Sequence, residues 1–333
     1  MRLPEAWRRY LIWGQAQGRS PRSLSPMRSI FRLFMVWSEA QGLTTIEQLT
    51  PEHFLAYQEE LSWRQTRTGR PITLGTQLNH LSVLRGFGRW LCEQDLLVSD
   101  PTRRLRLPRK PRQLPRVVPE VSDMLRLLEA PGGRPSLVVR DRAILECCYS
   151  TGLRRGEVVN LDLGDLDLQG GYCWVRQGKG RKDRVVPLGR LAAALIQHYL
   201  DGVRPQLLQG REDGALFVSL RGRRLSGRGI YALVKRAAAQ AQLSRAITPH
   251  TLRHAAATHM LRNGAPIRHL QEFLGHASVE TTQVYTQITI PELKAIHAKY
   301  HPRERLAECR ERSAPRQDEA QRASASVEAD ARA

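Results

Sequence analysis

The chain has 333 residues, 41% of them hydrophobic, and is long enough for two ordinary domains with separate cores. Lysine and arginine outnumber aspartate and glutamate by 52 to 32, and the resulting charge of +20 points to a polyanionic partner. No apolar run reaches the roughly 20 residues that span a membrane, and the first residues lack the apolar segment of a secretory signal. The cysteines, 5 in number and without a C-x-x-C pair, indicate neither a disulfide framework nor a zinc site, so we expect a soluble cytoplasmic protein.

Residues 1–99 are predicted to form a helical domain. Periodicity and end signals predict helices over residues 3–17, 25–41, 51–63 and 73–94. Thr50 and Pro51, for example, combine a capping hydroxyl with a proline in the first turn, where its missing N–H costs nothing. The aromatic residues recur at helical spacing, and we interpret them as core residues rather than as platforms for stacked bases.

Residues 100–116 are predicted to be a linker. The sequence from residue 100 to residue 119 is rich in arginine and in proline. Proline removes helical hydrogen-bond donors, so no helix is expected there. The clustered arginines suit a strap along a phosphate backbone, although a solvated linker explains the prolines equally well. At the other end of the chain, residues 303–333 are rich in alanine, serine, glutamate and arginine without periodicity, and we expect a disordered tail there.

Residues 117–302 are predicted to form a second domain, mainly α with a small antiparallel β-sheet. Its predicted helices cover residues 119–130, 136–150, 156–161, 190–209 and 227–242. Its predicted strands cover residues 165–168, 172–177 and 183–187, with a further short strand at 215–218. Gly178 and Gly180 flank Lys179 in the turn between the last two strands of the sheet, so we expect Lys179 at a hairpin tip.

Acidic residues of this second domain have competing interpretations. Asp162, Asp165 and Asp167 resemble the carboxylates of a two-metal nuclease, but no further carboxylate cluster supports such a site. Glu157 lies three residues after Arg154, and it either holds the Arg154 guanidinium in position or forms an ordinary surface ion pair.

The stretch 248–286 concentrates polar groups that suit chemistry on a phosphodiester. Thr248 and Pro249 predict the start of a helix, because a hydroxyl caps the open N–H groups and a proline follows at the first helical position. This start puts His250 and Arg253 on one face of the first turn.

A second short helix is predicted to end at Gly275, directly before His276, and a third is predicted to carry Tyr285. His250 and His254 also have the i, i+4 spacing of a metal pair. No glutamate lies between them and no nearby residue supplies a third ligand, so a metal site is not expected.

Three segments of this stretch, P-H-T-L-R-H, L-G-H and T-T-Q-V-Y-T, closely resemble the C-terminal signature of the tyrosine recombinases, the phage integrase superfamily, with the Xer-like branch most similar. Upstream, S-T-G-L-R-R-G-E at residues 150–157 resembles the segment that carries the first arginine of that family. Q-G-K-G-R-K-D-R-V-V-P-L at residues 177–188 resembles its lysine hairpin. The resemblance implies six catalytic residues, which are Arg154, Lys179, His250, Arg253, His276 and Tyr285.

The resemblance implies a site-specific DNA recombinase or integrase, with a core-binding domain at residues 1–99 and a catalytic domain at residues 117–302. Tyr285 would attack the scissile phosphate and form a 3′-phosphotyrosyl link, without ATP, metal or other cofactor. The two arginines of the set would hold the non-bridging oxygens, and Lys179 would protonate the leaving 5′-oxygen. The separate tasks of the two histidines stay open.

The resemblance also implies double-stranded DNA as the partner, a Holliday-junction intermediate and a tetramer on two sites. The tetramer would consist of identical subunits or include a related recombinase, and we expect a nucleoid-associated bacterial protein. Ile288, Leu293 and Ile296 would anchor a C-terminal helix in a neighbouring protomer. Gln287 departs from the histidine that many Xer-type members have after Y-T.

Two other functions are compatible with parts of this pattern. A type IB topoisomerase shares the phosphotyrosine step but relaxes DNA as a monomer, and the expected docking helix argues against it. A catalytically silent DNA-binding protein with the same fold would lose nothing when Tyr285 is replaced by phenylalanine.

Overall fold

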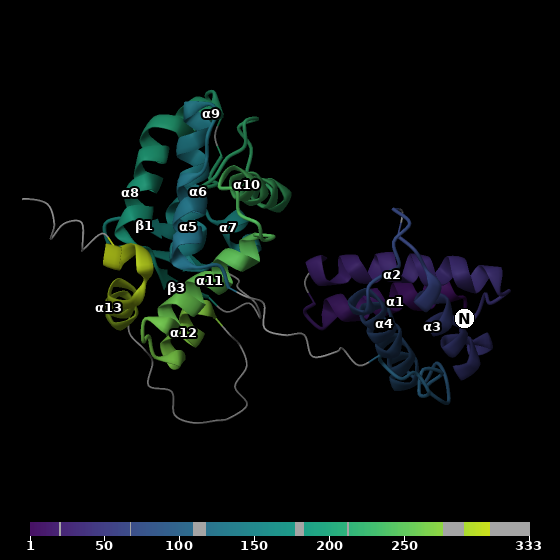
Figure 1. The fold of residues 1–333 in the computed structure, drawn as a ribbon. Helices are drawn as coiled ribbons and strands as arrows, with labels where there is room; N and C mark the ends of the chain where they lie inside the picture. Colours follow the sequence, from purple (N-terminus) through teal and green to yellow (C-terminus); the bar gives the residue numbers. More distant parts are fainter. Residues whose placement is uncertain are drawn as a thin grey trace, which may run out of the picture. The chain divides into compact units, whose positions relative to one another are not determined.

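The computed structural model describes residues 1–19, 21–66, 68–108, 118–176, 183–211, 213–275 and 290–306. The chain forms two compact units, Met1–Pro115 and Arg116–Ala333, which are described separately (Figure 1). Of the predicted linker at residues 100–116, the part from residue 109 onward lies outside the described residues. The chain is mainly helical and contains a three-stranded antiparallel sheet, so the predicted fold class is confirmed.

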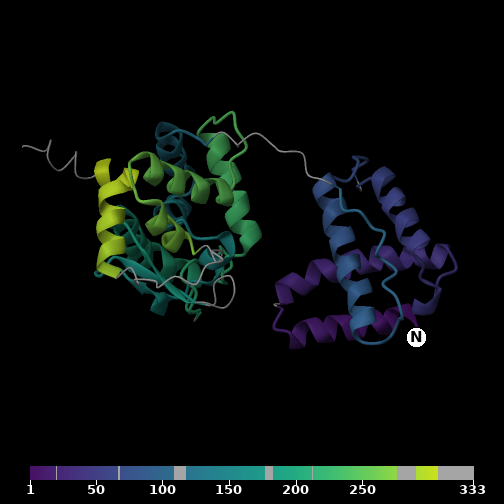
Figure 2. The same ribbon diagram turned by 90° about the horizontal axis from the view of Figure 1, so that it is seen from below.

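Four helices build the first unit around an aromatic core (Figures 1 and 2). They are α1 (Leu3–Ala16), α2 (Pro21–Ala40), α3 (Pro51–Trp63) and α4 (Leu74–Glu93), with the short 3-10 turn η1 (Ile46–Gln48) before α3. Trp7 stacks on Phe31 with ring centroids 4.1 Å apart, and Phe87 meets Trp7 edge-on at 5.2 Å. Because these rings fill the interior, they stabilise the helical packing and are not available to stack on bases.

Helix α2 begins one turn earlier than its sequence signals predicted. The start was expected at Ser25, but the helix begins at Pro21, so Pro26 lies inside it. Proline in a helix removes one backbone hydrogen bond. Leu24 and Met27 are both buried in the aromatic core, and their packing compensates for that loss.

The second unit is organised around the long helix α6, which contacts α5, α8, α10 and α11. Its helices are α5 (Val121–Glu129), α6 (Pro135–Thr151), α7 (Arg155–Asn160), α8 (Arg190–His198), α9 (Arg204–Leu208), α10 (Gly227–Gln240), α11 (Pro249–Arg262), α12 (Ile267–Leu274) and α13 (Ile290–Tyr300). The C-terminal half of α6 is buried on all sides, which explains why its sequence is apolar without a clear polar face.

A small antiparallel sheet contains β1 (Leu166–Asp167), β2 (Tyr172–Val175) and β3 (Arg184–Pro187), in that spatial order. Asp167 accepts a hydrogen bond of 2.5 Å from the Gly170 N–H and so closes the turn between β1 and β2. The strand expected at residues 215–218 is absent from this described segment, where isolated bridges pair Ala215 with Asp162 and Val218 with Arg224. The helix expected over residues 190–209 is interrupted by a π-helical turn, η3 (Tyr199–Val203).

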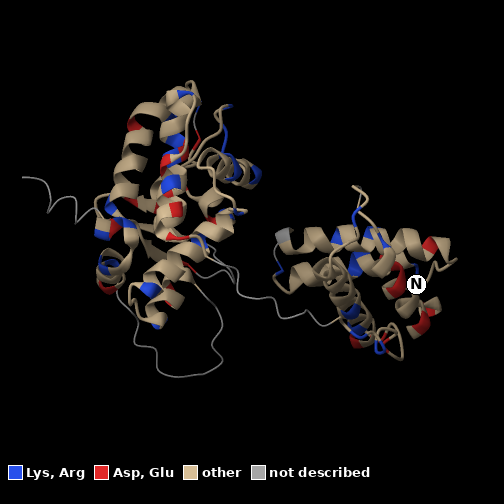
Figure 3. Ribbon diagram, viewed as in Figure 1, with Lys and Arg blue, Asp and Glu red and all other residues tan. Residues whose placement is uncertain are grey.

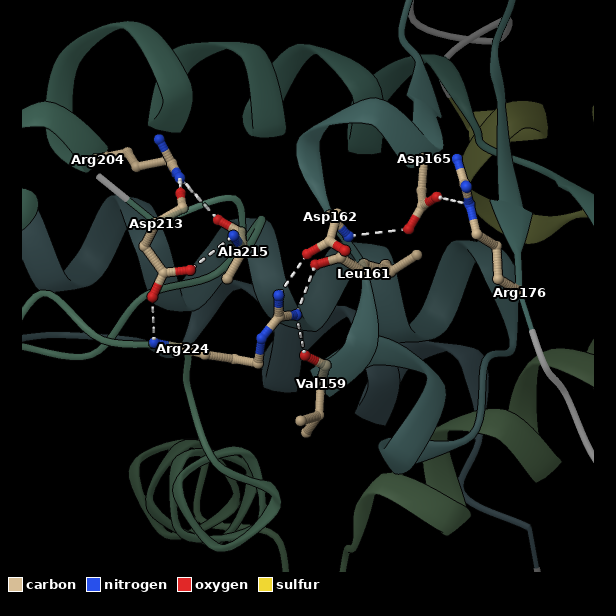
Figure 4. A network of polar contacts seen from close by, with 9 residues as sticks. All are labelled: Val159, Leu161, Asp162, Asp165, Arg176, Arg204, Asp213, Ala215 and Arg224. Carbon is tan, nitrogen blue, oxygen red and sulfur yellow. Dashed lines mark hydrogen bonds and ion pairs between the residues drawn. The ribbon is translucent and has the colours of Figure 1, made fainter. Parts of the chain in front are cut away.

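A polar network joins the loop after α9 to the segment after α7 (Figure 4). Arg224 donates to the carbonyl oxygen of Leu161 at 3.2 Å and pairs with the Asp162 carboxylate. Asp165, in the 3-10 turn η2 (Leu163–Asp165), accepts from the Asp162 N–H at 3.0 Å and from Arg176 Nε at 2.5 Å. Both carboxylates are therefore accounted for by ion pairs that hold these loops together.

The C-terminal segment packs on its own unit. His297 of α13 hydrogen-bonds through Nε2 to the carbonyl oxygen of Ser150 at 2.9 Å, and Ile296 lies against the core of the same chain. Beyond α13, Arg303 is buried and pairs with the buried Glu146. Residues 303–306, at the start of the predicted tail, belong to this described segment, and the rest of that tail lies outside the described residues. Docking of this helix into a neighbouring protomer stays a prediction.

Three histidines of this unit are buried as neutral rings. His259 contacts the Pro119 carbonyl oxygen through Nε2 and the Tyr149 hydroxyl through Nδ1, both at 2.8 Å. His301 Nδ1 accepts from the Arg303 N–H at 3.3 Å, which leaves Nε2 as the donor to the Tyr149 carbonyl oxygen. Burial lowers the pKa of these two rings and of His297 below the usual value.

We expect these histidines to make the second unit less stable in mild acid. The unfolded chain takes up protons near pH 6.5, whereas the folded chain resists them, so the stability is fully present above that pH and falls below it. Each histidine contributes at most about 1.4 kcal/mol per pH unit to the unfolding free energy. Urea unfolding followed between pH 7.5 and pH 5.5 should show the midpoint fall in the wild type and fall less steeply in His301→Gln. His198→Gln, at an exposed position, is the control, and an equal slope in all three proteins would refute the assignment.

Candidate active site

Arg154 lies where two helices meet. Helix α6 ends at Thr151 and is followed by Gly152, whose φ of 57° is left-handed, and Arg154 then stands at the N-cap of α7. A side chain at Gly152 would also put its Cβ 3.0 Å from the Phe273 ring. The Arg154 guanidinium, with 31% of the side chain exposed, donates to Glu157 Oε1 at 2.9 Å and to the Gly275 carbonyl oxygen at 3.2 Å. The charge is thus fixed in direction but still open to solvent.

Glu157 forms a buried ion pair rather than a surface one. Its side chain is 9% exposed and accepts from the backbone N–H and the guanidinium of Arg154 and from both terminal nitrogens of Arg184. Burial alone raises the pKa of this carboxyl, but the hydrogen bonds from Arg184 and from the Arg154 backbone outweigh it and bring the pKa below its usual range. Glu157 therefore remains ionised and holds Arg154, as one of the two sequence interpretations proposed.

Arg253 and His250 come from the first turn of α11, which begins as predicted at Pro249. The Thr248 hydroxyl accepts the Thr251 N–H at 3.2 Å and caps the helix. Arg253 is 5% exposed and donates to the carbonyl oxygens that end two other helices, Gly152 at 2.5 Å and Leu274 at 2.6 Å. Burial, assisted by the positive charge of Arg154, lowers the Arg253 pKa to about 10, so the guanidinium stays charged at neutral pH.

One cavity joins three of the six expected catalytic residues. Its volume is about 580 Å³, and Arg154, His250 and Arg253 all contribute to its wall. Among the described residues, the lining consists of Arg154, Arg155, Gly156, Tyr231, Thr248, Pro249, His250 and Arg253. Two guanidiniums beside a histidine in one open cavity suit an anion with several oxygens, because each guanidinium presents N–H groups in a fixed fork.

Sequence reasoning missed two side chains of this cavity, Arg155 and Tyr231. Arg155 directly follows the predicted Arg154, and a basic neighbour in a basic chain carries no signal of its own. Tyr231 comes from α10, a helix whose surface faces cannot be assigned to a site from its own sequence. Both side chains are exposed to solvent.

The remaining three expected residues, Lys179, His276 and Tyr285, lie outside the described residues. Among the residues that are described, no group of three or more histidine, cysteine or acidic side chains is placed to hold a metal ion. Within the same part of the chain, none of the helices is both long and apolar enough to cross a membrane.

The phage integrase family model matches residues 120–290, which is half of the chain. The tyrosine recombinase XerC 2 of Ralstonia nicotianae is 38% identical over 86% of this chain and 82% of its own length. The chain belongs to the phage integrase family. The Xer-like resemblance is therefore confirmed, and this integrase-family protein is a DNA-binding enzyme of site-specific strand exchange, as its motifs predicted.

Other relatives of this integrase-family protein agree. The tyrosine recombinase XerD of Oceanobacillus iheyensis is 42% identical over 67% of this chain and 75% of its own length. Among solved structures, a lambda integrase tetramer bound to a Holliday junction has a TM-score of 0.62 at 19% identity, and covers 87% of this chain and 81% of that one. This likeness supports the two-unit fold. Basic residues occur on helices of both units, which suits a polyanionic partner (Figure 3).

Proposed function

We propose that this protein cuts and rejoins DNA through a phosphotyrosyl intermediate formed by Tyr285. The observation that carries the proposal is the cavity in which Arg154, His250 and Arg253 meet, since a phosphodiester is the anion that an integrase-family enzyme must bind there. Attack by Tyr285 would leave a 3′-phosphotyrosyl link and a free 5′-hydroxyl. The link conserves the energy of the broken bond, so rejoining needs no ATP.

The described residues support specific roles in that reaction. A phenol with a pKa of about 10 is a poor nucleophile at neutral pH, and two arginines beside the phosphate favour its ionised form and stabilise charge on the non-bridging oxygens. Arg253 is held rigid by two carbonyl oxygens and Arg154 by Glu157, so neither has to reorganise as charge develops. His250 and His276 would donate to phosphate oxygens or manage the tyrosine proton.

We propose the larger assembly by analogy with the relatives. The predicted domain at residues 1–99 would serve as the core-binding domain and the predicted domain at residues 117–302 as the catalytic domain, joined by the basic linker. A tetramer on two DNA sites would exchange strands through a Holliday junction, as the lambda integrase tetramer bound to such a junction suggests. Its subunits would be identical or include a related recombinase, working on the nucleoid in the cytoplasm.

A plasmid assay tests recombination against the two alternative functions. Sites selected by binding from a randomised duplex library are placed as direct repeats on a supercoiled plasmid. A recombinase should delete the intervening segment and yield two circles, with a related recombinase added in a parallel reaction. Relaxation of a plasmid without sites, and no deletion, would indicate a topoisomerase. Binding without either product under both conditions would indicate a silent protein and contradict the proposal.

Lys179 is the proposed general acid, and its loss should be repaired by a better leaving group. Lys179→Ala is expected to slow cleavage of an ordinary duplex by ~10²–10⁴-fold. A duplex with sulfur at the 5′-bridging position should be cleaved by the variant at nearly the wild-type rate, because a thiolate leaves without a proton. Lys299→Ala, on the exposed side of α13, is the control. A Lys179→Ala defect that is equal on both substrates would rule out the general-acid role.

A further inference from the structure

Arg184 lies behind the active site, at the start of β3. Its side chain is 14% exposed, and its guanidinium forms a fork with the Glu157 carboxylate. Nη1 donates to Oε1 at 3.0 Å and Nη2 donates to Oε2 at 2.8 Å. A two-pronged pair of this kind fixes the plane of the carboxylate as well as its position. Arg184 is not part of the cavity wall, so any effect on the reaction must pass through other residues.

Glu157 is shared equally between two arginines. Oε1 accepts from Arg184 and, at 2.9 Å, from Arg154 Nη1, while Oε2 accepts from Arg184 and, at 2.8 Å, from the Arg154 backbone N–H. One carboxylate cannot neutralise two guanidiniums, so one positive charge is left over. Because Arg154 is the more exposed partner and lines the cavity, that charge is available to a phosphate.

Arg184 also contacts the second support of Arg154, the backbone of Gly275. A Cβ atom at Gly275 would lie 2.8 Å from Arg184 Nε and 2.9 Å from Cδ, so the guanidinium occupies the space that a side chain would need. Gly275 has a φ of 62°, and its carbonyl oxygen accepts from Arg154 Nη2 at 3.2 Å. The residue that follows it in the chain is His276.

We propose that Arg184 is a positioning residue for strand cleavage. By binding the Glu157 carboxylate, it prevents that group from neutralising Arg154, and by packing on Gly275 it fixes the carbonyl that orients the same guanidinium. Arg184 thereby leaves the charge of Arg154 available to the scissile phosphate and keeps its guanidinium aimed at that group. This inference rests on the proposed function, because it explains how Arg154 is held for its contact with the phosphate in that reaction.

The test compares Arg184→Met with Arg176→Met. Arg176 directly follows β2 and pairs with a buried aspartate, Asp165 (Figure 4). Its side chain is 68% exposed, and the ion pair it forms is with Asp165 rather than with Glu157. Single-turnover cleavage at saturating protein should fall about 10- to 100-fold in Arg184→Met, the usual cost of losing a residue that orients a catalytic group. Duplex affinity should change less than about threefold, because phosphate contacts elsewhere dominate binding. Arg176→Met should retain the wild-type cleavage rate.

A second substitution separates positioning from simple stabilisation. In Glu157→Gln no carboxylate remains to neutralise Arg154. Adding Arg184→Met to this variant should therefore lower the cleavage rate little further. The double variant should also cleave faster than Arg184→Met alone. Arg184→Lys, which keeps the charge without the fork, should be intermediate in rate and carries the comparison if Arg184→Met does not fold. The proposal is overturned if cleavage by Arg184→Met and Arg184→Lys equals wild type, or if the two substitutions lower the rate independently. Absence of cleavage by the wild type would instead count against the proposed function.

Discussion

Tyr285→Phe is expected to abolish cleavage while DNA affinity stays within about twofold of wild type. The substitution removes only the phenolic oxygen, which is the atom that would form the bond to phosphorus. Removing the nucleophile of an enzyme of this type lowers the rate by a factor of ~10⁴ or more. The remaining groups stabilise charge and move protons, but none of them attacks the phosphorus atom in place of the phenolic oxygen. Cleavage of a radiolabelled duplex and a gel-shift titration, made on the same preparation, measure the two quantities.

The control is a tyrosine of the same unit that lies outside the cavity wall. Tyr172→Phe, on β2, removes an equivalent hydroxyl and should cleave at the wild-type rate. If Tyr285→Phe still cleaved the duplex, another residue would be the nucleophile.

Arg253→Lys is expected to lower the cleavage rate by ~10²–10³-fold, the usual effect of removing one electrostatic partner of a transition state. Lysine keeps the charge but cannot reach two carbonyl oxygens and a phosphate at once, as the planar guanidinium can. Arg253→Ala should in addition lower the melting temperature, because the carbonyl oxygens of Gly152 and Leu274 would lose their buried donor, at about 1–3 kcal/mol each.

Arg262→Lys, at the exposed end of α11, is the matched control and should change neither rate nor melting temperature. Single-turnover kinetics and thermal melts of the three variants separate the two roles. If Arg253→Lys cleaved at the wild-type rate and only its melting temperature fell, Arg253 would stabilise the packing of the helices without taking part in the reaction.

Local signals predicted much of the helical framework. Thr50 with Pro51 and Thr248 with Pro249 mark helix starts that the structure reproduces, because capping hydroxyls and first-turn prolines act on their own helix. The prediction failed at Pro26, where burial of neighbouring side chains outweighs a local helix-start signal. It also failed at residues 215–218, where a strand-like sequence forms only isolated bridges.

The residues of the candidate site were predictable from the sequence, but the hydrogen bonds and ion pairs that hold them in position were not. Motifs located Arg154, His250 and Arg253, which line one cavity. They gave no indication that Arg253 is nearly buried between two carbonyl oxygens, or that Arg184 shares Glu157 with Arg154. Such contacts join residues that are far apart in the chain, and neither periodicity nor spacing encodes them.

The central claim is that Tyr285 becomes linked to a DNA 3′-phosphate, and a trapped intermediate tests it most directly. A duplex with a nick beside the scissile phosphate loses its short 5′-hydroxyl fragment and cannot be rejoined, so the protein should accumulate on the labelled strand in the presence of EDTA. After protease digestion, mass spectrometry should find the DNA on the peptide that contains Tyr285, and no adduct should form with Tyr285→Phe. An adduct through another residue, or no adduct from folded protein bound to this DNA with a related recombinase added, would contradict the account.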